Sequence, residues 1–404
     1  MTVAARQIRG RLARHRARRR ERAVAPVDLP LLVCALGLLA FGFVMVASAS
    51  MSIAANCCGD PFYYVNRHAL AMALALSAAV LAFAVPLDWW ERTGVWLFLF
   101  GLVMLVLVLV PGLGREVNGA TRWIPLGPLN LQPSELVKLF AIIYIAGYLV
   151  RHADDVVNRI SGFIRPMILI GIAGALILQQ PDFGTTAVML ATVMGMLFLG
   201  GVSLMPFIVL FVAVAAGLLV LVLTSPYRLQ RVTSFLDPFQ DPFNTGYQLS
   251  QALIAFGRGE WLGVGLGNGI QKQFFLPEAH TDFLASVVGE ELGLVGMLVL
   301  IGAFAFLTWR AFAIGVRAEA AGKRFAAYAA QGIGLGLGLQ AFVNIGVNVG
   351  MLPTKGLTLP FLSYGSNSLI AACMGVAILL RIDATVRQLE AEPGPRRGQP
   401  WVRA

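Results

Sequence analysis

Long apolar runs, which recur from residue 31 to residue 380, constrain this chain more than any other feature. Hydrophobic residues make up 58% of the 404 positions and charged residues only 13%, about half the share usual in soluble proteins. The runs are continuous and do not alternate with polar residues, which favours helices and argues against a membrane barrel. We therefore predict an all-α, polytopic membrane protein.

Ten of these runs are predicted to cross the membrane. They cover residues 31–49, 68–85, 94–110, 133–149, 163–178, 185–199, 205–223, 283–307, 326–344 and 365–380. Several are close to the minimum of roughly 17 residues that a crossing helix needs. Only residues 179–184 separate the fifth run from the sixth, and Pro181 favours a break there. We interpret the first run as a retained anchor, because it is long for a signal peptide.

Positive charge predicts where the two ends of the chain lie. The net charge is +10, and nine arginines fall within the first 22 residues. Such an arm could bind nucleic acid, but directly before an apolar span it is typical of a cytoplasmic N-terminus beside anionic lipid. We therefore expect no nucleic-acid partner, and ten spans place both termini in the cytoplasm. The predicted parts are a basic cytoplasmic tail (1–29), a ten-helix membrane domain (30–383) and a disordered cytoplasmic tail (384–404).

Two loops on the outer side are longer than a turn. Residues 111–132 include the turn dipeptide Asn118-Gly119, and residues 224–282 form a long extracytoplasmic loop between the seventh and eighth spans. A loop of that length is usually functional or carries short helices of its own. Residues 248–256 are apolar enough to form such a helix in the membrane interface.

The four cysteines indicate neither a disulfide framework nor a zinc site. Cys34 and Cys373 fall in apolar spans, where we predict small core residues. Cys57 and Cys58 are adjacent in the first outside loop, and a bridge between neighbours would be strained. The sequence contains no zinc-ligand spacing.

Acidic residues cluster where the long loop meets the eighth span. Glu278, Asp282, Glu290 and Glu291 all lie within residues 276–293. Carboxylates at or inside a membrane span are costly, so they are candidates for function. On a continuous helix Glu290 and Glu291 would lie roughly 12–14 Å deeper than Asp282. For these two we favour a structural role, as partners of a buried lysine or arginine, over a chemical one.

Four stretches carry a resemblance to a known family. They are NGATRWIPLGPLNLQPSELVK (118–138), YQLSQALIAFGRGEWLGVGLGNGIQKQFFLPEAHTDF (247–283), GEELGLVG (289–296) and LPTKGLTLPFLSYGSNSLI (352–370). They resemble the SEDS family, the polytopic proteins of shape, elongation, division and sporulation, from the first span to the tenth. Residues 255–261 and 353–361 look more like the division members than the elongation members. The family commonly reads SYGGSS where this chain has SYGSNS, so the resemblance supports no specific role for Ser366 or Asn367.

The resemblance implies a peptidoglycan glycosyltransferase that polymerises lipid II on the outer face of the cytoplasmic (inner) membrane, at the division septum. The growing lipid-linked glycan would be the donor and would lose undecaprenyl pyrophosphate. A class B penicillin-binding protein, the division transpeptidase, and other divisome membrane proteins are the implied partners. Two alternatives stay open: a lipid II flippase, which needs polar groups along the full membrane depth, and a non-enzymatic divisome scaffold.

The family's essential aspartate, in its HTDF motif, matches Asp282. The resemblance therefore makes Asp282 the general base that activates the attacking sugar hydroxyl. Position alone allows a second role, because aspartate is also a good helix N-cap. A divalent cation (Mg or Mn) could share the charge of the pyrophosphate, but no motif declares a metal site.

Eight further residues are candidates for substrate binding: Arg122, Trp123, Glu135, Lys138, Lys272, His280, Lys355 and Ser363. The outer-side cations Arg122, Lys272 and Lys355 could bind a pyrophosphate or contact lipid headgroups. Glu135 and Lys138 have the i, i+3 spacing of an ion pair, which would lower the cost of inserting both.

The remaining candidates have equally plain alternatives. Trp123 could stack on substrate or belong to the interfacial aromatic belt. His280 could orient Asp282 or be a satisfied loop histidine. In the ninth span, Gly332 and Gly336 have small-xxx-small spacing, which permits close approach of a partner helix or of another span of the same bundle.

Overall fold

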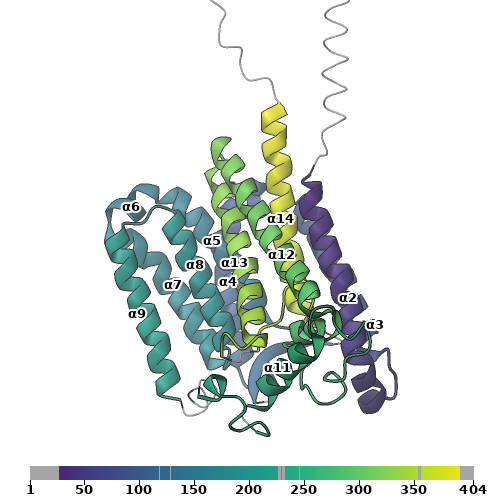
Figure 1. Ribbon diagram of the computed structural model, residues 1–404. Coiled ribbons are helices and arrows are strands. Elements are labelled where there is room, and N and C mark those ends of the chain that lie inside the picture. Colours follow the sequence, from purple (N-terminus) through teal and green to yellow (C-terminus); the bar gives the residue numbers. More distant parts are fainter. Residues whose placement is uncertain are drawn as a thin grey trace, which may run out of the picture.

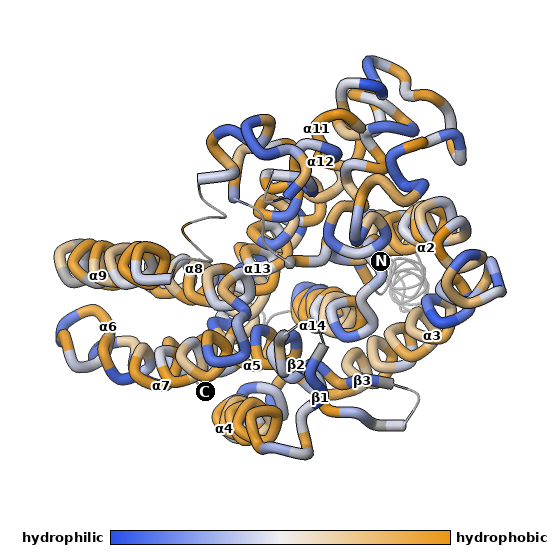
Figure 2. The backbone as a smooth tube through the Cα atoms, turned by 90° about the horizontal axis from the view of Figure 1, so that it is seen from below, coloured by the Kyte–Doolittle hydropathy of each residue, from blue (hydrophilic) through white to orange (hydrophobic). Residues whose placement is uncertain are grey.

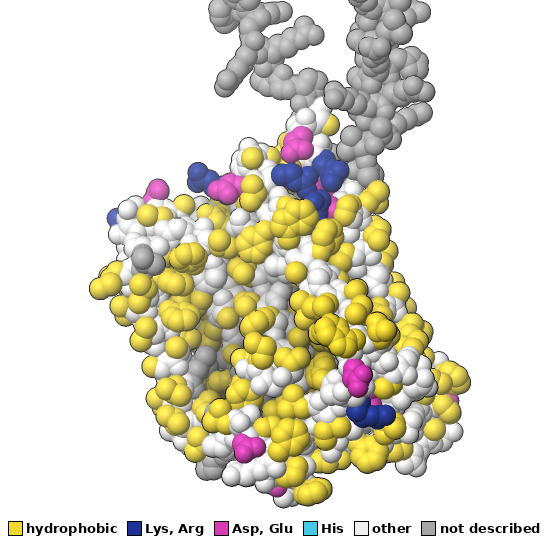
Figure 3. Space-filling view, in the orientation of Figure 1, with side chains coloured by type: hydrophobic (Ala, Val, Ile, Leu, Met, Phe, Trp, Pro, Cys, Tyr) yellow, Lys and Arg dark blue, Asp and Glu magenta, His cyan; other side chains and the backbone are white. Residues whose placement is uncertain are grey.

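The computed structural model describes residues 27–391, apart from positions 118, 128, 226–228, 230–232, 245, 354 and 355. Most of its helices lie side by side in one bundle (Figure 1). Hydrophobic side chains cover most of the bundle's visible side, and charged ones gather near its upper end (Figure 3). Most of the basic tail and residues 392–404 of the second tail lie outside the described residues.

The helices of the described chain are α2 (Leu29–Cys58), α3 (Tyr63–Ala84), α4 (Leu87–Leu109), α5 (Pro133–Arg151), α6 (Ala153–Asn158), α7 (Ile160–Gln179), α8 (Phe183–Leu199), α9 (Leu204–Leu223), α11 (Tyr247–Gly259), α12 (Leu284–Ala320), α13 (Arg324–Asn348) and α14 (Ser366–Ala391). Eight of them are long and apolar enough to cross a membrane: α2, α3, α4, α5, α7, α12, α13 and α14. The apolar stretches of α8 and α9 are shorter. The prediction of a polytopic helical membrane protein is confirmed at this level.

The loop between α4 and α5 corrects the all-α prediction. It forms a three-stranded antiparallel sheet of β1 (Arg115–Val117), β2 (Ala120–Leu126) and β3 (Leu129–Leu131), in the order β1-β2-β3. Of the turn dipeptide predicted there, Asn118 lies outside the described residues, and Gly119, directly before β2, has the positive φ of 73° that a tight hairpin turn requires. The sheet carries the candidates Arg122 and Trp123 on β2.

The middle of the bundle is formed by α5, α13 and α14. In the most apolar window of each, 83%, 61% and 72% of the residues are buried, against 22% for α3. Gly332 and Gly336 serve this packing: an added Cβ would lie 2.5 Å from Met196 Sδ of α8 and 3.2 Å from Ile142 Cδ1 of α5, respectively. The small-xxx-small face of α13 therefore packs inside the bundle and does not present itself to a partner.

The predicted eighth span is broken, although its sequence reads as one helix. At Gly293 of α12 the backbone turns to φ 64° and ψ −163°, which is not helical. The segment after α11 pairs with the break: Leu294 and Val295 N–H donate to the carbonyls of Glu260 and Trp261, at 2.9 and 3.1 Å. The carbonyls of Glu290 and Glu291 accept from the loop in return, both at 3.0 Å. Backbone groups at membrane depth need such partners, because lipid supplies none.

The first and last spans meet at one end of the bundle, where the predicted domain boundaries need correction. Asp28 caps α2 at Leu31 N (3.0 Å) and pairs with Arg310 of α12, so it belongs to the bundle rather than to the tail. α14 continues to Ala391, and residues 384–391 are therefore helical. Asp383 binds Arg317 at 2.6 Å and Arg387 at 2.7 Å.

The long loop contains the short helix that was predicted, whereas Cys57 and Cys58 do not lie in a loop as predicted. The expected short helix at 248–256 is α11, which packs against α12 beside the bundle ends (Figure 1). Hydrophilic residues gather in this loop region and around the sheet, whereas the helices are mostly hydrophobic (Figure 2). Cys57 and Cys58 are the last residues of α2 rather than loop residues, and both are free and exposed.

Candidate functional site

Asp282 lies in the turn that leads into α12 and is half-buried. Its main-chain carbonyl accepts hydrogen bonds from the side-chain amides of Asn344 and Asn348, both at 3.0 Å. The N-cap of α12 is Phe283, whose own side chain makes no capping hydrogen bond, and Asn348 Oδ1 accepts from Ser286 N in the first turn at 3.1 Å. The N-cap residue of α12 is therefore not Asp282, although that had been the alternative role for this aspartate.

Gly356 lies near both the Asp282 carboxylate and the Arg122 guanidinium. A Cβ built on Gly356 would lie 3.2 Å from Asp282 Oδ2 and 4.0 Å from Arg122 Nη1. The absence of a side chain at Gly356 leaves room for both groups. The rest of the Arg122 guanidinium is anchored, because Nε donates to Gln180 O at 2.9 Å and Nη2 to Pro181 O at 2.5 Å. Gly356 therefore lies between an anchored cation and a carboxylate.

Three other candidates for this region are Trp123, Lys355 and Ser363. Trp123 follows Arg122 on β2 and is half-buried, paired in register with Arg115. Lys355 precedes Gly356 but lies outside the described residues. The hydroxyl of Ser363 accepts from Leu359 N at 2.9 Å and is buried, so it closes a turn of the chain.

His280 is packed between two tyrosines. Its ring centroid is 4.8 Å from that of Tyr64 and 5.5 Å from that of Tyr364. Its carbonyl accepts from Tyr364 N at 2.9 Å, which ties the turn before Asp282 to the segment before α14. Burial lowers the pKa of His280, and the nearby Glu278 carboxylate opposes that shift in part. The contacts suit a neutral ring that holds the Asp282 turn in place.

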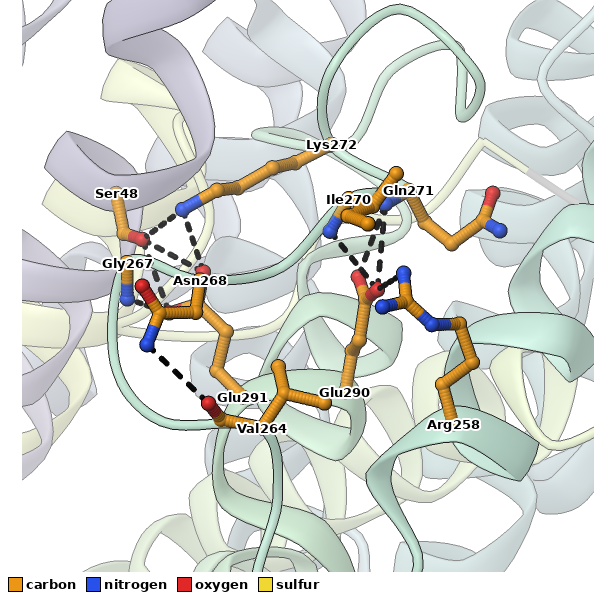
Figure 4. Close-up of polar contacts among 10 residues, drawn as sticks. All are labelled: Ser48, Arg258, Val264, Gly267, Asn268, Ile270, Gln271, Lys272, Glu290 and Glu291. Carbon is orange, nitrogen blue, oxygen red and sulfur yellow. Dashed lines mark hydrogen bonds and ion pairs between the residues drawn. The ribbon is translucent and has the colours of Figure 1, made fainter.

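Glu290 and Glu291 are fully buried, and each is neutralised (Figure 4). Glu290 accepts from Arg258 Nη1 at 2.9 Å and from Ile270 N at 2.9 Å. Glu291 binds Lys272 Nζ at 2.6 Å, and both of these side chains also bind the hydroxyl of Ser48 of α2. The structural role predicted for the two glutamates is confirmed.

This arrangement corrects the expectation for Lys272. Its side chain is only 4% exposed, and its ammonium group lies between Glu291 and Ser48. A lysine whose charge is already compensated offers little to a pyrophosphate. Of the three predicted outer-side cations, Arg122 is the one that the described structure brings close to Asp282.

Glu135 and Lys138 form the predicted intrahelical pair, with Lys138 Nζ 3.0 Å from Glu135 Oε1. Lys138 also donates to Gln340 Oε1 of α13 at 2.7 Å. Both line a cavity of about 50 Å³ between α5, α8, α13 and α14, together with Thr192 and Ser368. Most of the lining is apolar, and the polar groups come from Glu135, Lys138, Thr192, Gln340 and Ser368. A cavity of this size has room for a water molecule beside these groups.

Sequence reasoning missed one set of residues on α13. Gln340, Asn344 and Asn348 follow at intervals of four, so they share a face of the helix. All three are buried, and their amides join the Lys138 pair to the carbonyl of Asp282. The signal in the sequence is a polar residue at every fourth position of an otherwise apolar span.

The described residues do not gather a metal site. No three side chains among their His, Cys, Asp and Glu residues come together as ligands. A divalent cation normally takes several such oxygen ligands, so the carboxylates of this part of the chain do not fit one by themselves. We derive no step through a metal ion.

Comparison with known proteins supports the assignment that the motifs suggested. The family model described as "Cell cycle protein", for FtsW, RodA and SpoVE, matches residues 29–388. The chain is 73% identical over 385 residues to the probable peptidoglycan glycosyltransferase FtsW of Allochromatium vinosum, covering 95% of this chain and 96% of that one. It is 51% identical over 355 residues to the protein of that name from Coxiella burnetii, covering 88% and 95%.

Two solved structures share the fold. A chain from a study of the structural coordination of polymerization and crosslinking by a peptidoglycan synthase complex aligns with a TM-score of 0.72 and 30% identity, covering 90% of this chain and 99% of that one. The rod shape determining protein RodA of Thermus thermophilus aligns with a TM-score of 0.65 and 30% identity, covering 88% and 96%. With a family model that spans nearly all of its described residues, this chain belongs to the FtsW, RodA and SpoVE family of cell cycle proteins, the SEDS proteins.

Proposed function

We propose that this chain is a peptidoglycan glycosyltransferase that polymerises lipid II during septal cell-wall synthesis. The observation that carries the proposal is that the Asp282 carboxylate and the Arg122 guanidinium both approach Gly356, where a built Cβ would lie 3.2 Å from Oδ2 and 4.0 Å from Nη1. The relatives named peptidoglycan glycosyltransferase FtsW, which match along almost the whole chain, support the same activity. A base and an anchored cation that both approach one glycine suit a reaction that removes a proton and releases a pyrophosphate.

The residues suggest how the reaction proceeds. The acceptor is a sugar hydroxyl of the incoming lipid II, and Asp282 takes its proton as the oxygen attacks the anomeric carbon of the lipid-linked glycan. The bond to undecaprenyl pyrophosphate breaks, and the leaving group carries away the electron pair. A well-placed base contributes about 100-fold to 10,000-fold. Arg122 is placed to stabilise the negative charge that grows on the pyrophosphate.

The topology proposed for this activity has ten spans and two cytoplasmic termini. The arginines that bind Asp28 and Asp383 lie at one end of the bundle, which suits the cytoplasmic side. Asp282 precedes α12 at its other end, and both helical halves of α12 up to Arg310 separate it from these arginines. The site and the 224–282 loop would therefore face outward, in the inner membrane at the septum.

The proposed partners are a class B penicillin-binding protein and other divisome membrane proteins. The solved complex that couples polymerization with crosslinking supports a transpeptidase partner by likeness. A lipid II flippase is the second candidate function. The observation that favours it is the cavity beside Lys138, because it supplies polar groups at membrane depth.

A reconstituted assay tests the proposal and separates the alternatives. The purified full chain, with and without the co-purified transpeptidase, would be given fluorescent lipid II in detergent. Detergent offers no bilayer across which lipid II could be moved, so only polymerisation yields a product. We expect long glycan strands on gel electrophoresis. A chain that makes no glycan under either condition, yet equilibrates lipid II across proteoliposomes, would establish the flippase instead. Absence of both activities would favour the scaffold.

A further inference from the structure

Three amide side chains form a line along α13, and we call Gln340, Asn344 and Asn348 the amide ladder. They are 5%, 2% and 0% exposed. Buried amides inside an apolar span are costly unless each donor has an acceptor. The partners of the ladder therefore indicate what it is for.

Asn344 contacts two separate parts of the site with one nitrogen. Its Nδ2 carries two hydrogens. One hydrogen bond goes to the main-chain carbonyl of Asp282, at 3.0 Å, and the other to the carbonyl of Leu357. Because both hydrogens are used, Asn344 joins the turn that carries Asp282 to the segment around Gly356.

The neighbouring ladder residues hold the same two parts. Asn348 donates to the carbonyl of Asp282 at 3.0 Å and accepts from both the amide and the hydroxyl of Ser286, at 3.1 and 2.8 Å. Gln340 donates to Thr358 O at 3.0 Å, two residues after the glycine that lies against the Asp282 carboxylate. The ladder thus fixes Asp282 through its own carbonyl and through the segment that faces its carboxylate.

We propose that Asn344 is a positioning residue for Asp282. It holds the base at the distance from Gly356 at which the carboxylate can reach an acceptor hydroxyl, and it touches no substrate itself. This inference rests on the proposed function, in which Asp282 is the general base. A displacement of about 1 Å at a reacting group can cost about 100-fold in rate. Turnover should therefore depend on Asn344, whereas substrate binding should not.

The test compares Asn344→Asp with the parent in the lipid II assay. The substitution preserves shape but replaces a donor of two hydrogen bonds with an oxygen that faces two carbonyls. We expect kcat to fall about 100-fold and KM for lipid II to stay within about two-fold, since only transition-state geometry is lost. The matched control is Gln331→Met, which replaces another buried amide of α13. The hydrogen bonds described above to the carbonyls of Asp282 and Leu357 come from Asn344 and Asn348, not from Gln331. The control should retain parental kcat.

The outcomes separate this proposal from the function on which it rests. Asp282→Asn is measured in parallel: full activity there overturns the base assignment itself. An inactive Asp282→Asn beside an Asn344→Asp enzyme of parental kcat overturns the ladder alone. Asn344→Ser keeps one donor and covers the case in which the aspartate variant fails to fold. It should lose about 10-fold in kcat with KM unchanged, and a raised KM at parental kcat would refute the positioning role.

Discussion

The two halves of α12, residues 284–292 and 294–320, are continuous in sequence but differ in what holds them. Every residue from 284 to 291 is buried, and the two glutamates at its end are bound by the loop and by α2. The second half exposes one face, with Val299 and Leu298 accessible at 69% and 58%. Its charged contacts begin only at Arg310.

The difference teaches which forces place the site. A bilayer is enough to orient the second half, because its exposed face is apolar. The first half depends on specific polar partners, and a buried charge that loses its partner is far more costly than a lost apolar contact. Substitutions in the first half should therefore be severe, and comparable ones in the second half before Arg310 mild. Arg310 and Arg317 are excluded because they pair with the buried Asp28 and Asp383.

The largest expected effect is at Asp282, directly before the first half. Asp282→Asn keeps size and shape and should still insert and bind the transpeptidase, but lose about 100-fold to 10,000-fold in glycan synthesis. Asp282→Glu should also be poor, since an extra methylene displaces the carboxylate by about an ångström. Gel analysis of the glycan and co-purification of the partner measure both properties. Loss of partner binding together with activity would point to a structural role instead.

The next effect is at the end of the first half. Lys272→Met leaves the fully buried Glu291 without its cation, which should cost about 3–5 kcal/mol of folding free energy. Adding Glu291→Gln removes the stranded charge and should recover much of that loss. Thermal unfolding in detergent measures each variant. Arg258→Gln provides the comparison, because Arg258 is 35% exposed and its loss should matter less. If Lys272→Met and Arg258→Gln destabilise the protein equally, the exposure of the cation does not decide how much its ion pair contributes.

The junction of the halves gives a matched pair of glycine substitutions. Gly293→Ala forces a side chain into a positive-φ conformation, with Cβ 2.5 Å from Gly263 N, and should destabilise by at least about 1–3 kcal/mol. Gly302→Ala lies within the helical second half with no atom within 4 Å of the new Cβ, and should be neutral or stabilise by up to about 1 kcal/mol. The same unfolding assay applies. A tolerated Gly293→Ala would mean that the break is not required.

The smallest effect concerns pH. Burial lowers the pKa of His280 from its ordinary value of 6.5, so protonation favours the unfolded chain. The stability that the neutral ring contributes is present above pH 6.5 and is lost as the pH falls through that value towards the lower pKa of the folded state. Thermal midpoints measured between pH 7.5 and pH 5 should fall less steeply for His280→Gln than for the parent. Parallel curves would show that His280 does not titrate in this range.

The helical membrane fold could be predicted from the sequence, because long apolar runs are a strong signal. Asp282 was singled out because it stands in a specific motif, and its role as the base stays a prediction. The break at Gly293 was missed, because its cause is pairing with the segment after α11, distant in sequence. Lys272 was misjudged for a similar reason: no local pattern shows that Glu291 lies within its reach. Arg122 was named as a candidate, but only the fold shows that Arg122 and Asp282 both approach Gly356.

The contacts of α2 have a consequence for the whole site. Along α2, Asp28 pairs with Arg310, Cys34 donates to Ala303 O at 3.5 Å, and Ser48 donates to Glu291 at 2.8 Å. Residue numbers rise along α2 as they fall along α12, so the two helices keep one antiparallel register across the break. α2 thus contacts both halves of the broken helix α12. Deleting one residue between Cys34 and Ser48 would shift that register by about 1.5 Å and turn Ser48 away by about 100°. This would unlink the half formed by residues 284–292 while leaving the other half in place.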